Sequence, residues 1–431
     1  MLTLVFDDER LEEALSGTEQ GAGIRVMEGD RAVYANGDVT DVDDLLTLAG
    51  RAAASLARTG AQAVREPVPF RLEPASTVAL DPRDVPVERK VALLEGANTV
   101  ARSFDPRIEQ VTVMYREGVQ DVVVANSDGR YAMDHRVRLV FAVNAIARAG
   151  GLQQTGYESM GGTVGFEMMS EEAVEEVART AARRAILNLD AEPAPAGTYT
   201  VVISSEAGGT LIHETVGHGL EADFNDRGLS VYAGKLGQKV ASELITVIDD
   251  GRLPGKRGTN TIDDEGTPTQ RTVLIENGRL VAYLTDRTHA AKLGIGLTGN
   301  ARRESFRSLP ICRMTNTMIA PGTADPAEIL RSVKDGVFVR KMGGGQVDPV
   351  SGTFAFEISE GYRIRDGQLA EPLRGATLTG HAPTVMNEID MVGTDLGFSI
   401  GTCGKYGQGA PVADAQPTIR IPSIVIGGIA R

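Results

Sequence analysis

Changes in the spacing of apolar residues divide the first half of the chain into expected helices and strands. Residues 40–60 and 87–104 carry apolar side chains at helical spacing, and both segments are predicted to be helices. After residue 106 apolar residues recur at every second position, which predicts the antiparallel strands "IEQVTVMYREG", "VQDVVVANSDG" and "RYAMDHRVRLVFAV". Behind the N-cap Ser170, residues 171–189 again place apolar side chains on one helical face, so this helix is expected to pack on the predicted sheet.

The segment "DAEPAPAG", residues 190–197, has the composition of a linker. Its prolines cannot continue a helix and it has no apolar period, so the main domain boundary is expected there. Residues 1–190 are expected to form an N-terminal α/β region, divisible into 1–105 and 106–190, and residues 198–431 are expected to form a second domain.

Strand patterns dominate this second domain. Alternating apolar runs are joined by Asn-Gly at 277–278 and Asp-Gly at 366–367, dipeptides typical of tight hairpin turns. One short helix is expected in "DPAEILRSVKDG", from the cap Asp325 to a stop at Gly336. The predicted fold class is therefore α+β: an N-terminal α/β domain with an antiparallel sheet and helices, followed by a β-rich C-terminal domain.

Composition and charge narrow the classes of function. The 431 residues are 42% hydrophobic and 24% charged, as in globular domains, and no apolar run approaches the roughly 18 residues of a membrane span. The net charge of −14 argues against a general nucleic-acid binder, because such proteins need a basic surface. The first ten residues lack the pattern of a secretory signal. A cytoplasmic location is therefore expected, with no membrane partner.

The stretch "HETVGHG" places Glu214 directly after His213 and a second histidine, His218, five positions on. On a regular helix, residues five apart diverge by about 140°, so the two imidazoles would not meet. An i→i+5 π-bulge, or a helix break at Gly217, would bring them together, and such bulges are frequent at functional sites. The pattern therefore predicts a distorted helix that presents both histidines to a metal ion.

Such a site has a defined chemistry. Glu214 would lie beside the metal, where its carboxylate can take a proton from a water molecule bound there. A catalytic zinc ion usually has three protein ligands and one open position, so a third ligand is needed. Cys403, in the glycine-rich "GTCGKYGQG", is the preferred candidate, whereas Cys312 has apolar neighbours typical of a packed thiol. The competing interpretation makes both histidines ordinary residues of a short helix, with a structural Cys403.

Other stretches carry weaker signals. "MGGGQVD", residues 342–348, predicts either a plain turn or a close approach of the backbone to a ligand. His135, His289 and His381 have no metal-like neighbours in sequence and are expected to be ordinary surface or hydrogen-bonded histidines. None of them is added to the candidate metal site.

Beyond residue 198 the sequence resembles the TldD/PmbA metallopeptidases, also called TldD/TldE and historically modulators of DNA gyrase. The motifs that carry the resemblance stand in the family's order: "HETVGHGLEADFNDRG", "VASELITVIDDG", "TIDDEGTP", "VLIENGRL", "TGNARRES", "RMTNT", "GGGQVD", "GATLTG", "MVGTDL", "CGKYGQ" and "QPTIRI". The intact His-Glu-x-x-x-His motif is similar to that of the TldD branch, because the PmbA (TldE) branch typically lacks it. By this resemblance the metal ligands are His213, His218 and Cys403, and the catalytic glutamate is Glu214.

The same resemblance implies that the C-terminal domain is a metallopeptidase domain with one Zn²⁺ per chain, acting on unfolded proteins or peptides that enter as extended strands. It implies a dimer with a TldE/PmbA-type paralogue or with a second copy, and no direct nucleic-acid binding is expected. About twenty residues precede the family segment "GAGIRVMEGDRAVYANGD", so the first domain is expected to be shorter than usual. The alternative is a non-catalytic regulatory or partner subunit, of gyrase-modulator type, with a structural metal.

Overall fold

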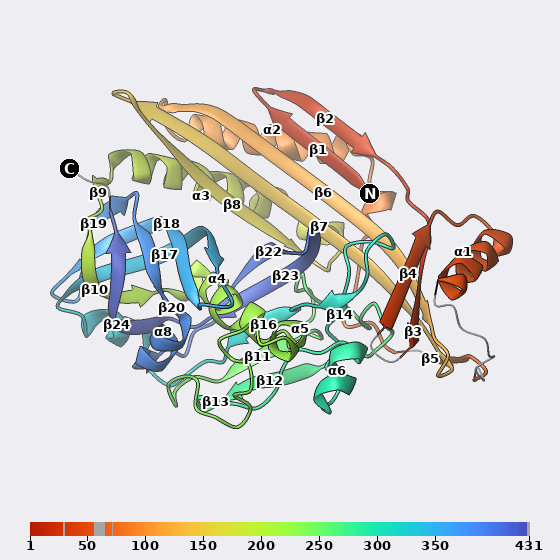
Figure 1. The fold of residues 1–431 in the computed structure, drawn as a ribbon. Coiled ribbons are helices and arrows are strands. Elements are labelled where there is room, and N and C mark those ends of the chain that lie inside the picture. The colour runs from red at the N-terminus through yellow and green to blue at the C-terminus, as the bar shows by residue number, and fades with distance from the viewer. Residues whose placement is uncertain (29–30, 56–64, 71, 429–431) are drawn as a thin grey trace.

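The computed structural model describes residues 1–28, 31–55, 65–70 and 72–428. A long, mostly antiparallel sheet crosses the top of the molecule in Figure 1, with two helices behind it and the β-rich C-terminal part below it. The predicted α+β class is confirmed. The elements of this N-terminal layer are β1 (Leu2–Asp7), β2 (Arg10–Ser16), β5 (Val68–Phe70), β6 (Ile108–Ala125), β7 (Arg130–Ala149), β8 (Leu152–Gly162), α2 (Val87–Ser103) and α3 (Glu171–Asp190).

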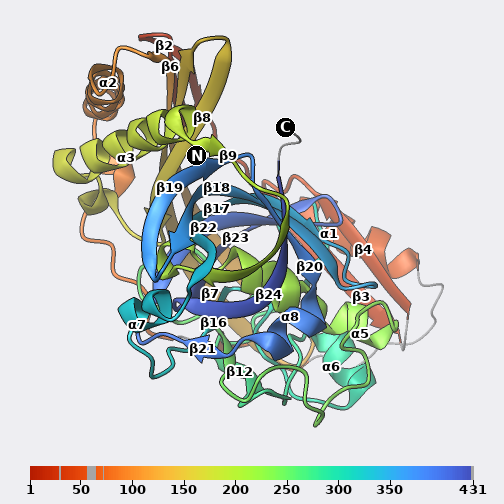
Figure 2. The same ribbon diagram turned by 90° about the vertical axis from the view of Figure 1, so that its left-hand side faces the viewer.

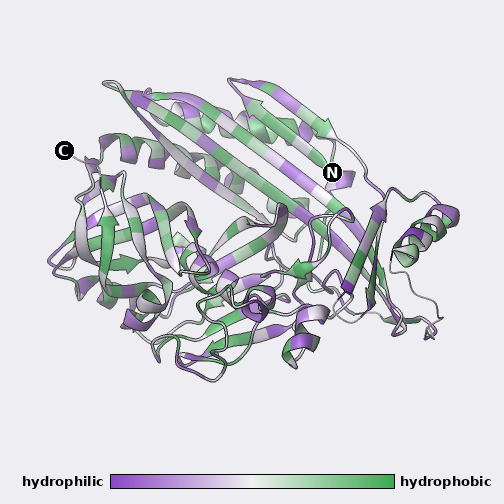
Figure 3. Cartoon of the chain, viewed as in Figure 1, coloured by the Kyte–Doolittle hydropathy of each residue, from purple (hydrophilic) through white to green (hydrophobic). Residues whose placement is uncertain are grey.

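The predicted antiparallel meander is the centre of this sheet. β6 pairs with β7 and β7 with β8, and hydrophobic and hydrophilic residues alternate along these strands (Figure 3). The turn expected between the first two strand patterns is wrong, because β6 continues through Gly118, which pairs with Arg138 in a ladder that is regular from Gln110 to Ala125. The strand β7 supplies backbone partners along the whole of β6, so a single glycine does not break it.

Both helices behind the sheet were predicted correctly. Ser170 caps α3 by accepting a hydrogen bond from Ala173 N–H, and the apolar face of α3 packs on β7 and β8. Arg183 and Arg184 of α3 then reach the barrel below, where they donate to the buried carboxylate of Glu360. Burial opposes the charge of Glu360, but the two arginines and a hydrogen bond from Tyr362 outweigh burial and lower the pKa of Glu360 to about 2. This cluster joins the N-terminal layer to the barrel.

A small unit formed by β3 (Ala22–Glu28), β4 (Arg31–Gly37) and α1 (Val42–Ala54) lies at one end of the molecule (Figure 1). α1 begins after the cap Asp41, inside the predicted 40–60 helix, and the expected C-terminal glycine of that helix falls outside the described residues.

The segment predicted as a linker is held in place by the barrel. α3 runs to Asp190, and β9 (Glu192–Pro193) then pairs in parallel with β19 (Gln368–Arg374) of the barrel. Ala191 and Ala194, on either side of β9, are buried. Proline tolerates this position because β9 is an edge strand of two residues.

The first C-terminal unit is a closed barrel. Its strands follow the order β17-β10-β24-β20-β18, and β17 also pairs with β18, which closes the ring seen in Figure 2. Asp366 and Gly367 have positive φ angles in the tight turn between β18 and β19, as the sequence predicted. The strands of the ring are β10 (Gly197–Ile203), β17 (Asp335–Val347), β18 (Thr353–Arg365), β20 (Thr377–His381) and β24 (Ile419–Gly427). β19 extends the sheet from β18, and β21 (Met391–Val392) pairs with β24 outside the ring order.

A second C-terminal sheet has the order β13-β12-β11-β16-β23-β22, so β22 forms one of its edges. The predicted Asn277-Gly278 turn joins β12 to β13, again with positive φ angles. The strands are β11 (Val247–Asp250), β12 (Arg271–Glu276), β13 (Arg279–Leu280), β16 (Asn316–Ile319), β22 (Gly397–Lys405) and β23 (Gln408–Gln416), and a separate pair is β14 (Ala301–Arg302) with β15 (Ile311–Cys312).

Short helices connect these strands. In α7 (Pro326–Arg331) the predicted cap Asp325 accepts from Ala327 N–H, but the predicted stop at Gly336 is wrong, because Gly336 lies in β17 and pairs with Thr200. None of the helices in the described ranges is long and apolar enough to cross a membrane. The remaining helices of the C-terminal part are α4 (Thr210–Ile212), the π-helix η4 (His213–Gly217), the 3₁₀-helices η3 (Ser205–Ala207) and η5 (His218–Leu220), α5 (Ala222–Asp226), α6 (Arg287–Leu293) and α8 (Ala382–Glu388).

Candidate metal centre

The stretch "HETVGHG" folds as a helix that widens at the histidines. After α4, residues His213–Gly217 form the π-helix η4, and His218 N–H donates to His213 O. The two imidazole rings meet edge to face with their centres 5.0 Å apart. The predicted π-bulge is therefore present. Gly217 has ordinary helical φ and ψ angles, so it is not needed for an unusual backbone conformation. It is needed because no larger residue fits: a Cβ there would come within 1.9 Å of Met314 Sδ.

Cys403 reaches these histidines from the edge strand β22. Its Sγ lies 3.3 Å from His218 Nε2, and one ligand atom from each of His213, His218 and Cys403 falls within 4.8 Å of the others. A tetrahedral zinc ion would separate a thiolate sulfur from an imidazole nitrogen by about 3.6 Å. The predicted residues, 185 positions apart in sequence, are thus brought together at a spacing that fits zinc.

A carboxylate fixes each imidazole from behind. His213 Nδ1 lies 2.8 Å from Asp414 Oδ1, and His218 Nδ1 lies 3.0 Å from Glu221 Oε2. A carboxylate only accepts hydrogen bonds, so each Nδ1 carries a proton and Nε2 is the atom left for a metal. Glu221 was within reach of sequence reasoning, since it follows His218 by three residues in the same motif. Asp414 gave no such signal, because only the fold brings β23 to the helix.

Lys405 supports the second of these carboxylates. Its Nζ lies 2.9 Å from Glu221 Oε2, 2.7 Å from Asp223 Oδ1 and 3.1 Å from the carbonyl oxygen of Cys312. Burial opposes the ionisation of Glu221, but Lys405 and His218 outweigh burial and lower the pKa of Glu221 to about 2. Lys405 is two residues beyond Cys403 in β22, so both side chains lie on one face of the strand. That face therefore carries the thiol and also the cation that binds Glu221, the carboxylate that orients His218.

The thiol is poised to be a thiolate. Burial opposes its ionisation, but His213 and His218 outweigh burial and lower the pKa of Cys403 to about 4. The same thiolate and Asp414 overcome burial at His213 and raise its pKa well above the ordinary value. A thiolate with two imidazoles is a donor set that suits zinc. Binding of zinc would displace protons from the two histidines.

Glu214 lies in the wall of the pocket that opens onto these residues. None of the described residues donates a hydrogen bond to its carboxylate. Burial raises its pKa above the ordinary value, although His213 and His218 act against this. The carboxylate is therefore free to accept a proton from a substrate or a water molecule in the pocket.

The pocket itself, of about 620 Å³, lies between the barrel and the second C-terminal sheet. One wall is β22 from Ser399 to Lys405, and the other includes residues 344–347 of β17. "MGGGQVD" is thus neither a plain turn nor a free loop. It belongs to β17, whose pairing with β18 is irregular between Met342 and Gly345, and its backbone lines the pocket.

Comparison with known proteins identifies the chain. The sequence models of the PmbA/TldA metallopeptidases match it in three parts: the C-terminal domain over residues 196–428, the central domain over 80–189 and domain 1 over 1–56. The chain belongs to the PmbA/TldD metallopeptidase family. The resemblance stated from the motifs is confirmed.

Relatives within the PmbA/TldD family carry the name metalloprotease. The metalloprotease TldD homologue of Buchnera aphidicola is 35% identical to this chain and covers 98% of it and 90% of its own length. The TldD homologue of Haemophilus influenzae is 36% identical, with 98% and 90% covered. The metalloprotease of Methanothermobacter thermautotrophicus is also 36% identical, with 99% and 93% covered. These names support a protease that uses a metal ion.

Solved structures share the PmbA/TldD fold. A putative modulator of a DNA gyrase from Thermotoga maritima superposes with a TM-score of 0.81 at 21% identity, covering 99% of this chain and 93% of its own. TldE from Thermococcus kodakarensis gives 0.78 at 19% identity, covering 99% and 95%. At these identities the likeness is one of fold.

Asp414 offers a test of how the histidines are held. Asp414→Asn removes the charge that fixes His213 and is expected to weaken zinc binding by about 10–100-fold, because ligand-orienting carboxylates have effects of this size. Competition with a chromophoric chelator measures the affinity. Asp395→Asn is the matched control, since Asp395 bonds Thr418 and contacts neither histidine. Equal affinity in the wild type and Asp414→Asn would contradict this role.

A second group of ligand-type side chains escaped sequence reasoning. Asp286, His289 and Cys312 place one atom each within 4.8 Å of the others. Asp286 caps α6 by accepting from the backbone N–H of His289 at 2.7 Å, and it binds the His289 ring at 2.8 Å. Burial, Asp286 and Asp223 raise the pKa of Cys312, which keeps it a thiol. His289 is thus hydrogen-bonded, as expected.

The other two histidines that the sequence analysis left out of the metal site are also hydrogen-bonded. His135 bonds Asp121 at 2.7 Å and His381 bonds Thr384 at 2.9 Å.

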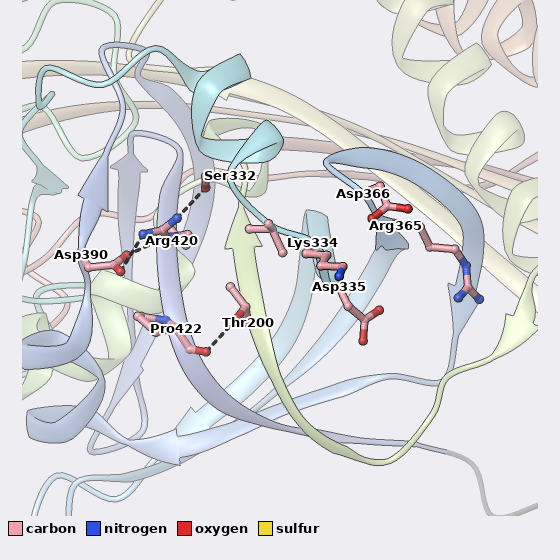
Figure 4. Close-up of a pocket in the computed structure, with 10 residues that line it drawn as sticks. Thr200, Ser332, Lys334, Asp335, Arg365, Asp366, Asp390, Arg420 and Pro422 are labelled. Carbon is pink, nitrogen blue, oxygen red and sulfur yellow. Dashed lines mark hydrogen bonds and ion pairs between the residues drawn. The ribbon is translucent and has the colours of Figure 1, made fainter.

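A pocket at the barrel end has no residue in common with the metal pocket (Figure 4). Its most prominent pair is Arg420 with Asp390 at 2.8 Å, and Arg420 also donates to Ser332 Oγ. These charges satisfy one another, and Lys334 in the same wall is exposed.

Proposed function

We propose that the chain is a zinc-dependent peptidase of the TldD type, with one Zn²⁺ held by His213, His218 and Cys403 and with Glu214 as general base. The observation that carries the proposal is the convergence of both imidazoles and the thiol on one point beside an unbonded glutamate. A zinc ion at that point would lower the pKa of a bound water and polarise the scissile carbonyl.

The side chains of this site would divide the work of peptide hydrolysis. Glu214 takes the proton of the attacking water and then gives it to the amine that leaves, which is general acid–base catalysis by one carboxylate. Asp414 and Glu221 hold the imidazoles in the tautomer with Nε2 free. Lys405 neutralises Glu221, so that the pair stays charged and ordered although it is buried.

Unfolded proteins and peptides are the proposed substrates. β22 pairs only with β23 in the described part of the chain, so one of its edges is open to another strand. An extended peptide laid along that edge would be held by main-chain hydrogen bonds, which do not depend on its side chains. The peptide bond opposite Cys403 would then lie beside Glu214.

The runner-up function is a non-catalytic partner subunit with a structural metal. Two features favour the enzyme. A structural zinc site is closed by four protein ligands, whereas three residues converge here beside an open pocket. A structural site also has no use for a carboxylate without a hydrogen-bond partner. Cleavage of casein, an unfolded protein, by zinc-loaded but not by metal-free chain is the direct test.

The proposed partner is a TldE-type paralogue or a second copy of the chain, and the proposed location is the cytoplasm. A TldE protein is among the structures that share this fold. Purification from the native host, with the partner identified by mass, decides between a heterodimer and a homodimer.

A further inference from the structure

A second cavity, of about 670 Å³, adjoins the metal pocket. It lies where β8 and α3 of the N-terminal layer meet β17, β18 and β22. The walls of the two hollows share Thr210, Gly344, Ser399 and Ile400. A peptide that follows β22 away from Cys403 therefore passes from the metal pocket into this cavity.

Two cationic side chains at one end of the cavity have no carboxylate partner in the described part of the chain. Lys256 Nζ stands 3.9 Å from the centre of the Phe398 ring. Arg257 donates to Gly401 O, and its buried Nε has no acceptor among the described residues. Burial lowers the pKa of Lys256, and burial together with Arg116 lowers that of Arg257 to about 10. Both cations are partly withdrawn from water without a counter-charge.

The other charges of this cavity do not compensate them. Glu158 is already bonded to Arg184 at 3.1 Å and to Lys341 at 3.3 Å. The remaining carboxylate in the wall, Glu357, is exposed and lies beside Gly343 of β17. The uncompensated charge at the Lys256 end is positive, and a cation removed from water is stabilised by an anion that comes with the ligand.

We propose that this cavity is a subsite for a carboxylate of the substrate, which binds between Lys256 and Arg257 while the peptide lies along β22. The inference rests on the proposed peptidase function and adds a substrate class to it: peptides with an acidic group at a fixed distance from the cleaved bond. Lys256 lies over Phe398, five residues before Cys403, and Arg257 donates to the carbonyl of Gly401, two residues before it, so the acidic group lies about two to five residues from that bond. An Asp or Glu side chain and a free C-terminus carry the same carboxylate chemistry.

The test is a charge reversal at Lys256, read with short fluorogenic peptides. One set has blocked ends and a single Glu, Gln or Lys moved through the sequence, and a second set has no acidic side chain but a free or amidated C-terminus. For the wild type, kcat/KM is expected to be about tenfold higher for the best-placed carboxylate than for its neutral match. Lys256→Glu should reverse this order and favour Lys. Lys334→Glu, with the same charge change in the pocket of Figure 4, should behave as the wild type.

The two peptide sets separate the sources of the carboxylate, because only the first responds to a side chain and only the second to the terminus. Equal kcat/KM for acidic and neutral peptides at every position, or an unchanged preference in Lys256→Glu, would overturn the subsite while leaving the peptidase in place. Binding of the same peptides to Glu214→Ala, followed by fluorescence anisotropy, does not need cleavage. If nothing is cleaved but acidic peptides still bind about tenfold more tightly, the peptidase proposal fails and the subsite stands.

Discussion

Glu214→Ala is expected to lose casein cleavage by about 10²–10⁴-fold while keeping its zinc. The loss follows because a positioned general base contributes that factor, and the other carboxylate of the pocket wall, Asp414, is already bonded to His213. Zinc is expected to stay because Glu214 is not one of the three proposed ligands, which make their hydrogen bonds to other groups. Zinc content by elemental analysis and casein cleavage are measured on the same preparation.

Glu243→Ala is the matched control for this variant, because it removes one exposed carboxylate that pairs only with Lys239. It should cleave casein at the wild-type rate. Wild-type cleavage by Glu214→Ala would exclude Glu214 as the base. Loss of zinc together with activity would instead make Glu214 part of the metal site.

Cys403→Ser is expected to weaken zinc binding by about 100-fold or more. Loss of a carboxylate that only orients a ligand lowers metal affinity by about 10–100-fold. Cys403 would be a ligand itself, so the effect of losing it should be at least as large. Serine keeps nearly the same size but does not ionise near neutral pH, so it cannot replace the thiolate that His213 and His218 stabilise. Chelator competition at neutral pH gives the affinities of wild type and variant.

Cys312→Ser is the control, because Cys312 is equally buried and belongs to the other group of ligand-type residues. It should hold zinc as tightly as the wild type. Equal affinities in all three proteins would remove Cys403 from the metal site, and a loss in Cys312→Ser alone would move the site to Asp286 and His289.

Much of the candidate site could be predicted from sequence because its geometry is local. A five-residue spacing between histidines requires either a π-bulge or a helix break to make them converge, and the π-helix at His213–Gly217 is the first of these. The choice of Cys403 over Cys312 was right about proximity to His213 and His218, although Cys403 approaches them from the strand β22 and not from a loop. Its predicted role as a ligand stays a prediction.

The residues that sequence reasoning missed act over long distances. Asp414 and Lys405 lie about 200 and 185 residues beyond the histidines whose environment they set. The local sequence of β22 and β23 does not indicate these roles, although Lys405 lies in the motif "CGKYGQ". Lys256 and Arg257 could not be singled out from the sequence either, because the absence of a carboxylate partner is known only when the neighbours in the fold are known. Burial and pairing are properties of the fold, so the chemistry that depends on them cannot be read from spacing.

The errors in the fold have the same origin. Gly118 was expected to end a strand, but β7 supplies hydrogen-bond partners on both sides of it, and tertiary pairing overrides the local preference of glycine. Gly336 was expected to stop α7 and instead lies in β17. The caps Ser170 and Asp325 and the turns at 277–278 and 366–367 were predicted correctly because they depend on neighbours in sequence.

Titration of zinc back into metal-free protein tests the central claim most directly. The chain is stripped with a chelator, zinc is restored stepwise, and casein cleavage is followed at each step. The account predicts no cleavage without zinc and a rise that saturates at about one zinc per chain, since one three-ligand site is proposed to carry the reaction. Cleavage by the stripped chain at the wild-type rate, or no cleavage at any zinc level, would contradict it.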